Sequence, residues 1–156
     1  MTLTISRATC ADIAALAYAG REFFAESSMS ITNDLDDSTM YASIKSMVMA
    51  DDYLVLIAKD GDLPAGFISW QLEKLWTKQV TATLGMFYVR KRYRNGKISK
   101  CLLDISLKMC EDRGASVFYA ASLAGLDDKG INERAFMSYF SRKGFRAIGK
   151  LLSRSD

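Results

Sequence analysis

The sequence of 156 residues contains no histidine. This absence excludes a Ser-His-Asp triad, a Cys-His dyad, a histidine general base and a histidine-rich metal site within one chain. The three cysteines, Cys10, Cys101 and Cys110, are too scattered for a zinc knuckle. We interpret them as reduced thiols of a cytosol-like compartment, with Cys101 and Cys110 packing on a helix. The sequence therefore predicts no metal site and no disulfide scaffold.

Long hydrophobic runs are also missing, since every apolar stretch is far shorter than the ~20 residues of a membrane span. The first residues, Met1 to Ile5, lack the basic and apolar regions of a signal peptide. We expect a cytoplasmic protein without a membrane partner. The composition, 49% hydrophobic and 25% charged, is close to the globular average, and the length predicts a single domain over residues 1–156.

The net charge is only +3, but the charged residues are unevenly distributed along the chain. Acids dominate the first half of the chain, notably between Asp34 and Asp62. A basic segment without any acid follows, and it contains Arg90, Lys91, Arg92, Arg94, Lys97 and Lys100. A second basic group runs from Arg142 to Arg154. A basic segment in an otherwise acidic chain indicates an anion bound at one place.

Hydrophobic spacing predicts an α/β fold in the order β-α-α-β-β-β-α-β-α-β, a mixed sheet of about six strands with helices on both faces. One strand is expected to place Val80, Ala82, Leu84, Met86 and Tyr88 on the same face. The expected strands are 2–6, 53–58, 65–71, 80–90, 117–121 and 145–152, and the expected helices are 13–24, 40–48, 98–109 and 132–140.

Three local features carry further expectations. Thr9 and Asp12 resemble a capping pair at the start of the first helix. Met40, Met47 and Met49 on the second helix are interpreted as core residues, with a flexible acceptor groove as the alternative. Trp70 and Trp76 flank the third strand and its following loop. They could clamp a flat or apolar acceptor, but a half-buried Trp at a strand end is an ordinary feature.

The segment from Tyr88 to Lys100 carries the clearest chemistry, because it joins a strand to a helix. A helix N-terminus offers unpaired N–H groups and about half a unit of positive charge. Asn95, Gly96 and Ser99 are small enough to let an anion approach that backbone. These features suit a pyrophosphate, and a solvated basic turn is an equally weighted alternative. The spacing of a Walker loop or of a Rossmann fingerprint is absent.

The same segment resembles the signature of the GNAT superfamily of acyl-CoA N-acyltransferases. That signature is Arg or Gln, two residues, Gly, one residue, then Gly or Ala, after a strand that ends in Val. Val89 ends the strand and Arg94 stands at the Arg/Gln position. Lys97 and Ser99 occupy the two small-residue positions, and Gly96 comes one place early.

The resemblance extends over nearly the whole chain. Arg7-Ala8-Thr9 with Asp12 is similar to the family's first strand and helix, and Leu54 to Gly66 is similar to its second and third strands. Asn132 followed by Phe140 to Phe145 resembles its closing helix. The segment from Arg21 to Ser28 weakly resembles small bacteriophage-encoded members, which implies the host cytoplasm as location.

The resemblance implies that acetyl-CoA is the cosubstrate and binds where strands 80–89 and 117–121 separate. Pantetheine would pair with the backbone near Phe87 and Val89, the pyrophosphate would rest on the amides from Arg94 to Lys100, and Asn132 would face the pantetheine or the acyl group. The cofactor-binding residues implied are Phe87, Val89, Arg94, Asn95, Gly96, Lys97, Ser99, Lys100, Asn132 and Phe140.

The sequence departs from the family at both usual proton-transfer positions. Strand 80–87 holds no acid, and Thr83 stands where a Glu is often found. Phe140 replaces the usual Tyr, which leaves its neighbour Tyr139 as the candidate catalytic residue. A base could instead come from other acids, although surface acids are usually only solvated. Those acids are Glu22, Glu26, Glu73 and Asp127.

The function implied is an N-acetyltransferase whose amine acceptor, a small molecule or a protein, attacks the thioester directly. The acidic stretch from Asp34 to Asp52 suggests a cationic acceptor. A non-catalytic binding module of the same fold is the first alternative. A protein that acts on nucleic acid ranks below it, because a net charge of +3 is modest for that class. The oligomeric state stays open, with a dimer among the options.

Overall fold

The computed structural model describes residues 2–27, 34–74, 76–94, 96–121 and 133–147. The chain divides into two compact units. The first consists of Met1–Phe23 with Asp36–Ala120, and the second of Phe24–Leu35 with Ala121–Asp156. Whether the chain behaves as the single domain expected from its length stays a prediction.

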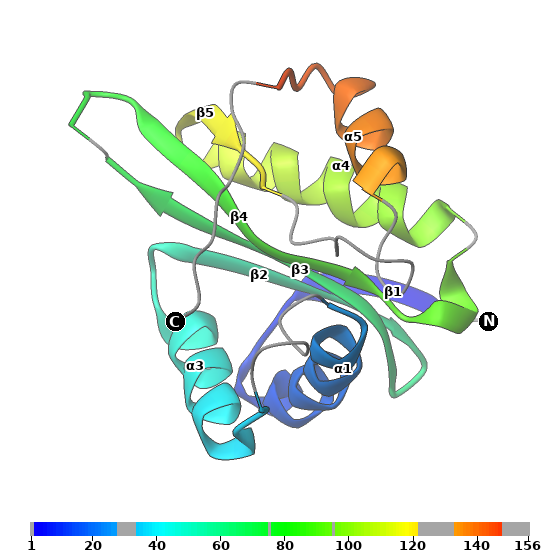
Figure 1. Ribbon diagram of the computed structural model, residues 1–156. Helices are drawn as coiled ribbons and strands as arrows, with labels where there is room; N and C mark the ends of the chain where they lie inside the picture. Colours follow the sequence, from blue (N-terminus) through cyan, green and yellow to red (C-terminus); the bar gives the residue numbers. More distant parts are fainter. Residues whose placement is uncertain (1, 28–33, 75, 95, 122–132, 148–156) are drawn as a thin grey trace. The chain divides into compact units, whose positions relative to one another are not determined.

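The elements follow the expected order as far as the described residues reach (Figure 1). The strands are β1 (Leu3–Arg7), β2 (Tyr53–Asp60), β3 (Leu63–Glu73), β4 (Val80–Val89) and β5 (Ala115–Tyr119). The helices are α1 (Ile13–Glu26), α3 (Asp37–Met49), α4 (Lys97–Asp112) and α5 (Glu133–Ser141), with short 3₁₀ turns η1 (Cys10–Asp12) and η2 (Lys91–Tyr93).

The strands form one mixed sheet in the order β1-β2-β3-β4-β5. All neighbouring strands pair antiparallel except β4 and β5, which are parallel and joined through α4, because a parallel pair needs a long crossover. The described part of the chain has five strands where about six were expected. Residues 145–147 are not a strand, and the rest of the predicted strand 145–152 lies outside the described residues.

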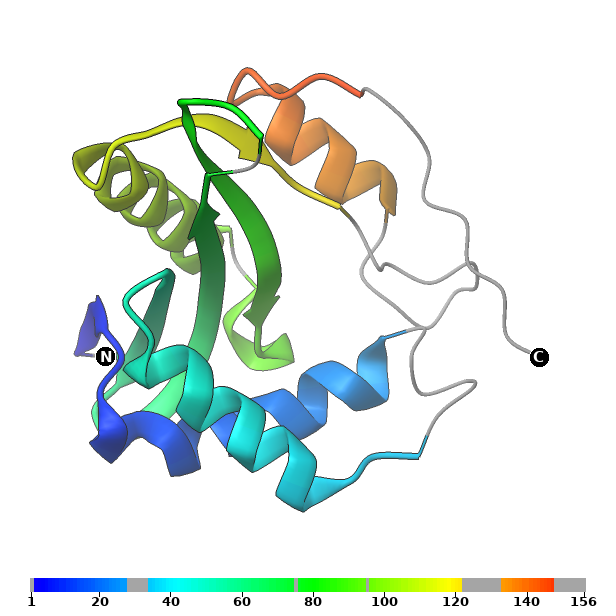
Figure 2. The ribbon, with the colours of Figure 1, turned by 90° about the vertical axis from the view of Figure 1, so that its left-hand side faces the viewer.

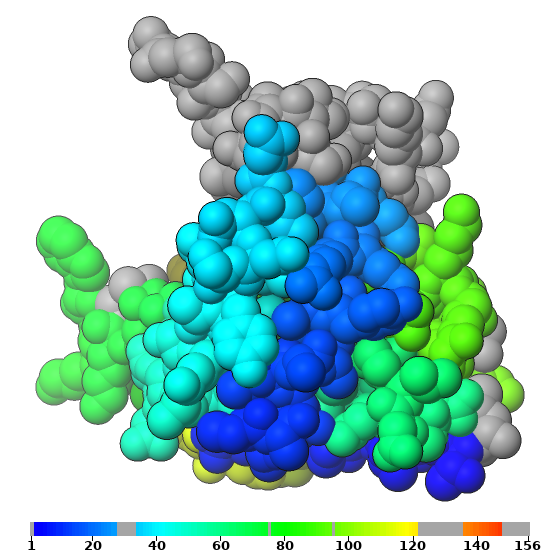
Figure 3. Space-filling model, turned by 90° about the horizontal axis from the view of Figure 1, so that it is seen from below, coloured from blue at the N-terminus to red at the C-terminus, as the bar shows by residue number. Residues whose placement is uncertain are grey.

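Helices cover both faces of the sheet in the first unit, as predicted. Figures 1 and 2 show α4 on one face and the α1–α3 pair on the other, and Figure 3 shows α1 in blue and α3 in cyan side by side. The double cover explains why β2 is buried without interruption from Leu54 to Ala58. Trp70 is also fully buried, because its ring packs on the α4 side and its indole N–H donates to Ser106 of α4 at 2.9 Å. Trp70 is therefore a core residue, whereas Trp76 is fully exposed.

The α1 face of the sheet is closed by an aromatic cluster. Phe23 of α1 contacts Phe67 of β3 and Tyr88 of β4 with ring centroids 6.2 and 5.8 Å apart. Gly20 brings α1 close to α3, because a Cβ there would stand 3.2 Å from the Met40 sulfur. These contacts bury the α1 stripe that the spacing of apolar residues predicted.

Two packing expectations fail at surface positions. Met49 is 62% exposed at the end of α3, so it is not a core residue. Cys101 is exposed on α4, whereas Cys110 is buried as expected. The α4 surface that carries Cys101 faces solvent because Ile98, Leu102 and Cys110 form its buried stripe.

Candidate functional site

The parallel strand β5 pairs with only the first part of β4. Their pairing runs from Val80↔Ala115 to Thr83↔Tyr119, where β5 ends, while β4 continues to Val89. Figure 2 shows β5 in yellow beside the start of the green β4, which runs on past the end of β5. The later half of β4, from Leu84 to Val89, therefore has no β5 partner within the described residues.

A β-bulge in β4 lies directly after the last pair. Trp70 of β3 pairs with Leu84, but Ser69 pairs with Met86, so Gly85 is an extra residue without a partner in this ladder. Because Ser69 and Trp70 point to opposite faces of β3, Leu84 and Met86 also lie on opposite faces. The prediction that Leu84 and Met86 share a face is therefore wrong. A glycine inside a strand is the sequence signal that could have revealed the bulge.

The helix that follows β4 begins with an accessible backbone. Gly96 is the N-cap of α4 with φ of +82°, a left-handed conformation that favours glycine. As a glycine, Gly96 has no side chain with which to cap the first turn. Lys97 and Lys100 are exposed at this end, and the Lys100 ammonium lies 3.5 Å from Asp104. The helix therefore presents its positive N-terminus and two lysines to solvent, which suits a phosphate group.

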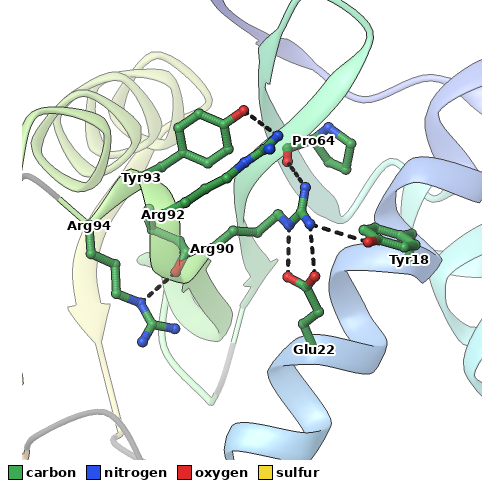
Figure 4. Close-up of polar contacts among 8 residues, drawn as sticks. Tyr18, Glu22, Pro64, Arg90, Arg92, Tyr93 and Arg94 are labelled. Atoms are coloured by element: carbon green, nitrogen blue, oxygen red, sulfur yellow. Dashed lines mark hydrogen bonds and ion pairs between the residues drawn. The ribbon is translucent and has the colours of Figure 1, made fainter.

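Arg90, by contrast, makes its hydrogen bonds within the protein. Its guanidinium donates to both carboxylate oxygens of Glu22 on α1, at 2.7 and 2.8 Å, and to the Pro64 carbonyl at 3.0 Å (Figure 4). It also lies over the Tyr18 ring, 4.8 Å from the centroid. The Arg90 side chain is 11% exposed, so the anion-binding role expected for the whole basic segment does not extend to this residue.

The same ion pair argues against Glu22 as a general base. Hydrogen bonds from Arg90 lower the pKa of Glu22 below its ordinary value of 4.5, although partial burial acts in the opposite direction. Hydrogen bonding to Glu22 raises the pKa of Arg90 in turn. A carboxylate with a lowered pKa is a weaker base, because efficient proton transfer needs a pKa near the working pH.

Two further arginines also donate hydrogen bonds to groups of the protein. Arg92 donates to the Tyr93 hydroxyl at 2.6 Å, and that hydroxyl lies 3.3 Å from Asp60 at the end of β2. Arg94 donates to the Val89 carbonyl at 2.8 Å and so braces the end of β4 (Figure 4). The loop after β4 is thereby ordered by its own arginines, while its lysines stay on the surface.

The structure brings together the implied cofactor residues of the first unit. Phe87 and Val89 lie on the part of β4 beyond its pairing with β5, and Arg94 leads into the first turn of α4, which contains Gly96, Lys97, Ser99 and Lys100. Asn95 and Asn132 lie outside the described residues. The structure does not test the role of any of these residues in binding, so the set stays a prediction.

Phe140 and Tyr139 belong to α5 in the second unit. The Phe140 ring stacks on Phe136 with centroids 4.4 Å apart and meets Phe145 edge-on at 5.0 Å. The Arg142 guanidinium lies 5.9 Å from the Tyr139 ring centroid. Phe140 thus contributes to an aromatic cluster of α5, and the catalytic role of Tyr139 stays a prediction.

The described residues contain neither a membrane-spanning helix nor a cluster of metal ligands. No helix in this part of the chain is long and apolar enough to cross a membrane. In the same residues, no group of three or more Cys, Asp or Glu side chains is placed to hold a metal ion. The part of β4 beyond its pairing with β5, together with the start of α4, is therefore the candidate site.

Comparison with known proteins identifies this arrangement. Residues 25–126 match the family model described as the acetyltransferase (GNAT) domain. The comparison with curated proteins gave no match.

Three solved structures share the fold at low sequence identity. A transcriptional regulator from Bacillus halodurans C-125 has a TM-score of 0.79 at 14% identity, covering 99% of this chain and 100% of its own. AAC(6')-Iy, solved with a bisubstrate analog CoA-S-monomethyl-acetylneamine, has a TM-score of 0.76 at 11% identity, covering 100% and 99%. Glucosamine-6-phosphate N-acetyltransferase from Arabidopsis thaliana has a TM-score of 0.72 at 12% identity, covering 99% of both chains.

Proposed function

This chain belongs to the GNAT acetyltransferase family, and on that premise we propose that it transfers an acetyl group from acetyl-CoA to an amine. One observation carries the proposal. The β4–β5 pairing ends at Thr83 and Tyr119, and β4 then leads to the open N-terminus of α4. An extended ligand with an anionic group fits this combination of strand backbone and helix N-terminus.

The residues present suit the parts of acetyl-CoA. The backbone of β4 near Phe87 and Val89 would pair with pantetheine. The first turn of α4, from Gly96 to Lys100, would bind the pyrophosphate through backbone N–H groups and lysine charge. Arg94 would act by bracing the end of β4 through the Val89 carbonyl. Asn95, Asn132 and Phe140 stay in the proposed set on the family resemblance alone.

The reaction we propose is direct attack of the amine nitrogen on the thioester carbonyl carbon. A C–N bond forms, the C–S bond breaks, the nitrogen loses a proton and the CoA thiolate gains one. No covalent enzyme intermediate is needed, so the absence of histidine is no obstacle. Correct orientation of the two substrates can by itself lower the barrier by several kcal/mol. Tyr139 is proposed as the donor of the proton to the thiolate.

The acceptor we propose is a small cationic amine. The structural neighbours include enzymes named for aminoglycoside and glucosamine-6-phosphate acetylation. Two acids at the start of α3 already have partners within the protein. Asp36 caps α3 by accepting the Thr39 N–H, and Asp37 pairs with Arg21 at 2.8 Å. Asp34 is exposed. A protein amine is the alternative that an acceptor panel would reveal.

A pair of charge reversals on α4 tests the cofactor site. Lys100 and Lys108 are similarly exposed and each pairs with an Asp four residues later, but only Lys100 stands at the N-terminus of α4. We expect Lys100→Glu to weaken acetyl-CoA binding by about tenfold or more, measured by calorimetry, because it places a negative charge beside the pyrophosphate. Lys108→Glu is the control and should leave the affinity unchanged. Equal effects, or no binding by the wild type, would contradict the proposed cofactor site.

Turnover on a panel of amines then separates an enzyme from a binding module. We expect release of CoA thiol with at least one amine, and we expect Tyr139→Phe to lower kcat by about 10²-fold with little change in KM for acetyl-CoA. Acetyl-CoA binding without turnover on any acceptor would instead support the non-catalytic module. One observation favours that alternative. Glu22, a candidate general base, is held in an ion pair with Arg90.

A further inference from the structure

The hairpin that joins β3 to β4 carries a fully exposed tryptophan. The last pair of the two strands is Glu73↔Thr81, and Trp76 lies in the turn beyond that pair. Figures 1 and 3 show this end of the hairpin, in green, protruding from the other elements of the first unit. The φ of Trp76 is +32°, which a bulky residue rarely adopts. A large apolar side chain outside the core, on a strained backbone, favours a role in binding.

The charge around Trp76 has one sign. Lys74 and Lys78 flank the tryptophan in the sequence, and both are exposed. The segment from Lys74 to Gln79 contains no acid. The ion pairs found among the described residues include neither lysine. Two cations beside an exposed indole ring suit a counterpart that is both apolar and negatively charged.

A surface of that kind lies at the base of the same hairpin. Asp51 and Asp52 form the exposed turn between α3 and β2, and the ion pairs of the described residues include neither acid. Met49, at the end of α3, is 62% exposed. The Asp52 carbonyl accepts the N–H of Leu72 at 2.6 Å, so this turn lies beside β3 where the hairpin leaves the sheet.

The two surfaces make the hairpin complementary to a second copy of itself. We call Lys74, Trp76 and Lys78 the tip, and the base consists of Met49, Asp51 and Asp52. Two hairpins that lie side by side in opposite directions would place the tip of each on the base of the other. Lysines would then meet carboxylates, and the indole ring would meet a methionine sulfur, which is a favourable contact. Such an arrangement has two-fold symmetry, the commonest symmetry of homo-oligomers.

We propose that the β3–β4 hairpin is the interface of a homodimer, in which the tip of each protomer binds the base of its partner. An anionic membrane or a nucleic acid fits the tip less well, because Asp51 and Asp52 at the base would repel it, whereas a second copy uses both charges. The interface is small beside the 1,200–2,000 Å² of a typical stable complex, so the dimer dissociates on dilution. The proposal does not depend on acetyl-CoA binding.

Sedimentation equilibrium of the whole chain, from micromolar to millimolar concentration, is the first experiment. We expect the average mass to rise from one copy to two, and we expect Trp76→Ser to raise the dissociation constant of the dimer more than tenfold. Leu63→Ser is the matched control, because Leu63 is 52% exposed at the opposite end of β3 and should not contribute. A wild type that stays monomeric throughout, or equal effects of the two variants, would overturn the proposal.

Charge reversal tests which surfaces meet. The tip variant combines Lys74→Glu with Lys78→Glu, and the base variant combines Asp51→Lys with Asp52→Lys. Each variant alone should be monomeric where the wild type is dimeric, because like charges then face each other. An equimolar mixture of the two should form a dimer again, because each tip meets a base of opposite charge. A mixture that stays monomeric would refute the pairing of tip with base.

Other partners give distinct results. Binding of monomeric wild type to phosphatidylserine vesicles or to single-stranded DNA, lost in Trp76→Ser, would overturn the proposal and assign the tip to that partner. The measurements contain no acetyl-CoA. A failure of the proposed enzymatic function therefore leaves their outcome unchanged, and a monomeric protein that acetylates amines would refute the dimer alone.

Discussion

The ion pair between Arg90 and Glu22 offers a prediction whose size follows from the structure. The change is Glu22→Gln, which keeps the shape of the side chain and removes its charge. Arg90 is 11% exposed and Glu22 is 34% exposed, so the pair lies between the surface and the core. Breaking a buried pair costs about 3–5 kcal/mol, and breaking an exposed pair costs about 0–1 kcal/mol.

We expect Glu22→Gln to lower the free energy of unfolding by about 2 kcal/mol, between these limits. The cost stays below the buried limit because Arg90 keeps the Pro64 carbonyl and the contact with Tyr18. For a chain of this size, the melting temperature should fall by about 4–8 °C at neutral pH. Thermal or urea denaturation followed by circular dichroism measures the change.

A matched control and the pH dependence test the reasoning. Asp37→Asn neutralises an acid in the exposed pair with Arg21, whose side chains are 51% and 59% exposed, and should cost less than about 1 kcal/mol. Because hydrogen bonds from Arg90 lower the pKa of Glu22, the pair stabilises the fold fully above the ordinary pKa of 4.5. This contribution is lost as the pH falls through the lowered value, so wild type and variant should converge in acid. A constant difference at every pH, or equal effects of the two variants, would refute the assignment.

The remaining predictions concern β3 and the thiols. Gly66→Ala should destabilise the protein by about 3 kcal/mol in urea denaturation, because a Cβ there would stand 2.7 Å from the Tyr88 backbone carbonyl, which cannot move aside; a cost near zero would contradict the close packing of β3 against β4. Burial raises the pKa of the Cys110 thiol to about 12, so a thiol reagent at neutral pH should label the exposed Cys101 and leave Cys110 unmodified in the folded protein. Equal labelling of both cysteines in mass spectrometry would contradict the burial of Cys110.

Local sequence determined most of the element order, because the interactions that start and end these elements lie close together in the chain. Thr9 and Asp12 form the predicted capping box, with the Thr9 N–H 2.8 Å from the Asp12 carboxylate. Gly61, with φ of +59°, lies between β2 and β3, in the gap between the strands that were expected at 53–58 and 65–71. The family resemblance of the segment from Val89 to Ser99 is confirmed by the match of residues 25–126 to the GNAT family model.

The site itself depended on partners that are distant in the sequence. The composition showed a run of basic residues, but only folding places Glu22 beside Arg90, which is 68 positions away, and leaves Lys97 and Lys100 at the surface. The basic segment therefore divides into Arg90, Arg92 and Arg94, which donate hydrogen bonds within the protein, and Lys97 and Lys100, which are exposed. The spacing of residues cannot predict this division, because every Arg and Lys of the segment carries the same charge in the unfolded chain.

The bulge in β4 shows the same limit for a strand. Alternation along 80–88 predicted a regular strand, since Val80, Ala82, Leu84, Met86 and Tyr88 are all hydrophobic. The extra residue at Gly85 is decided by the register with β3 and by the hydroxyl of Ser69, neither of which is local to β4. Hydrophobic periodicity reports which residues can be buried, whereas pairing across strands decides where the ladder breaks and where β4 leaves β5.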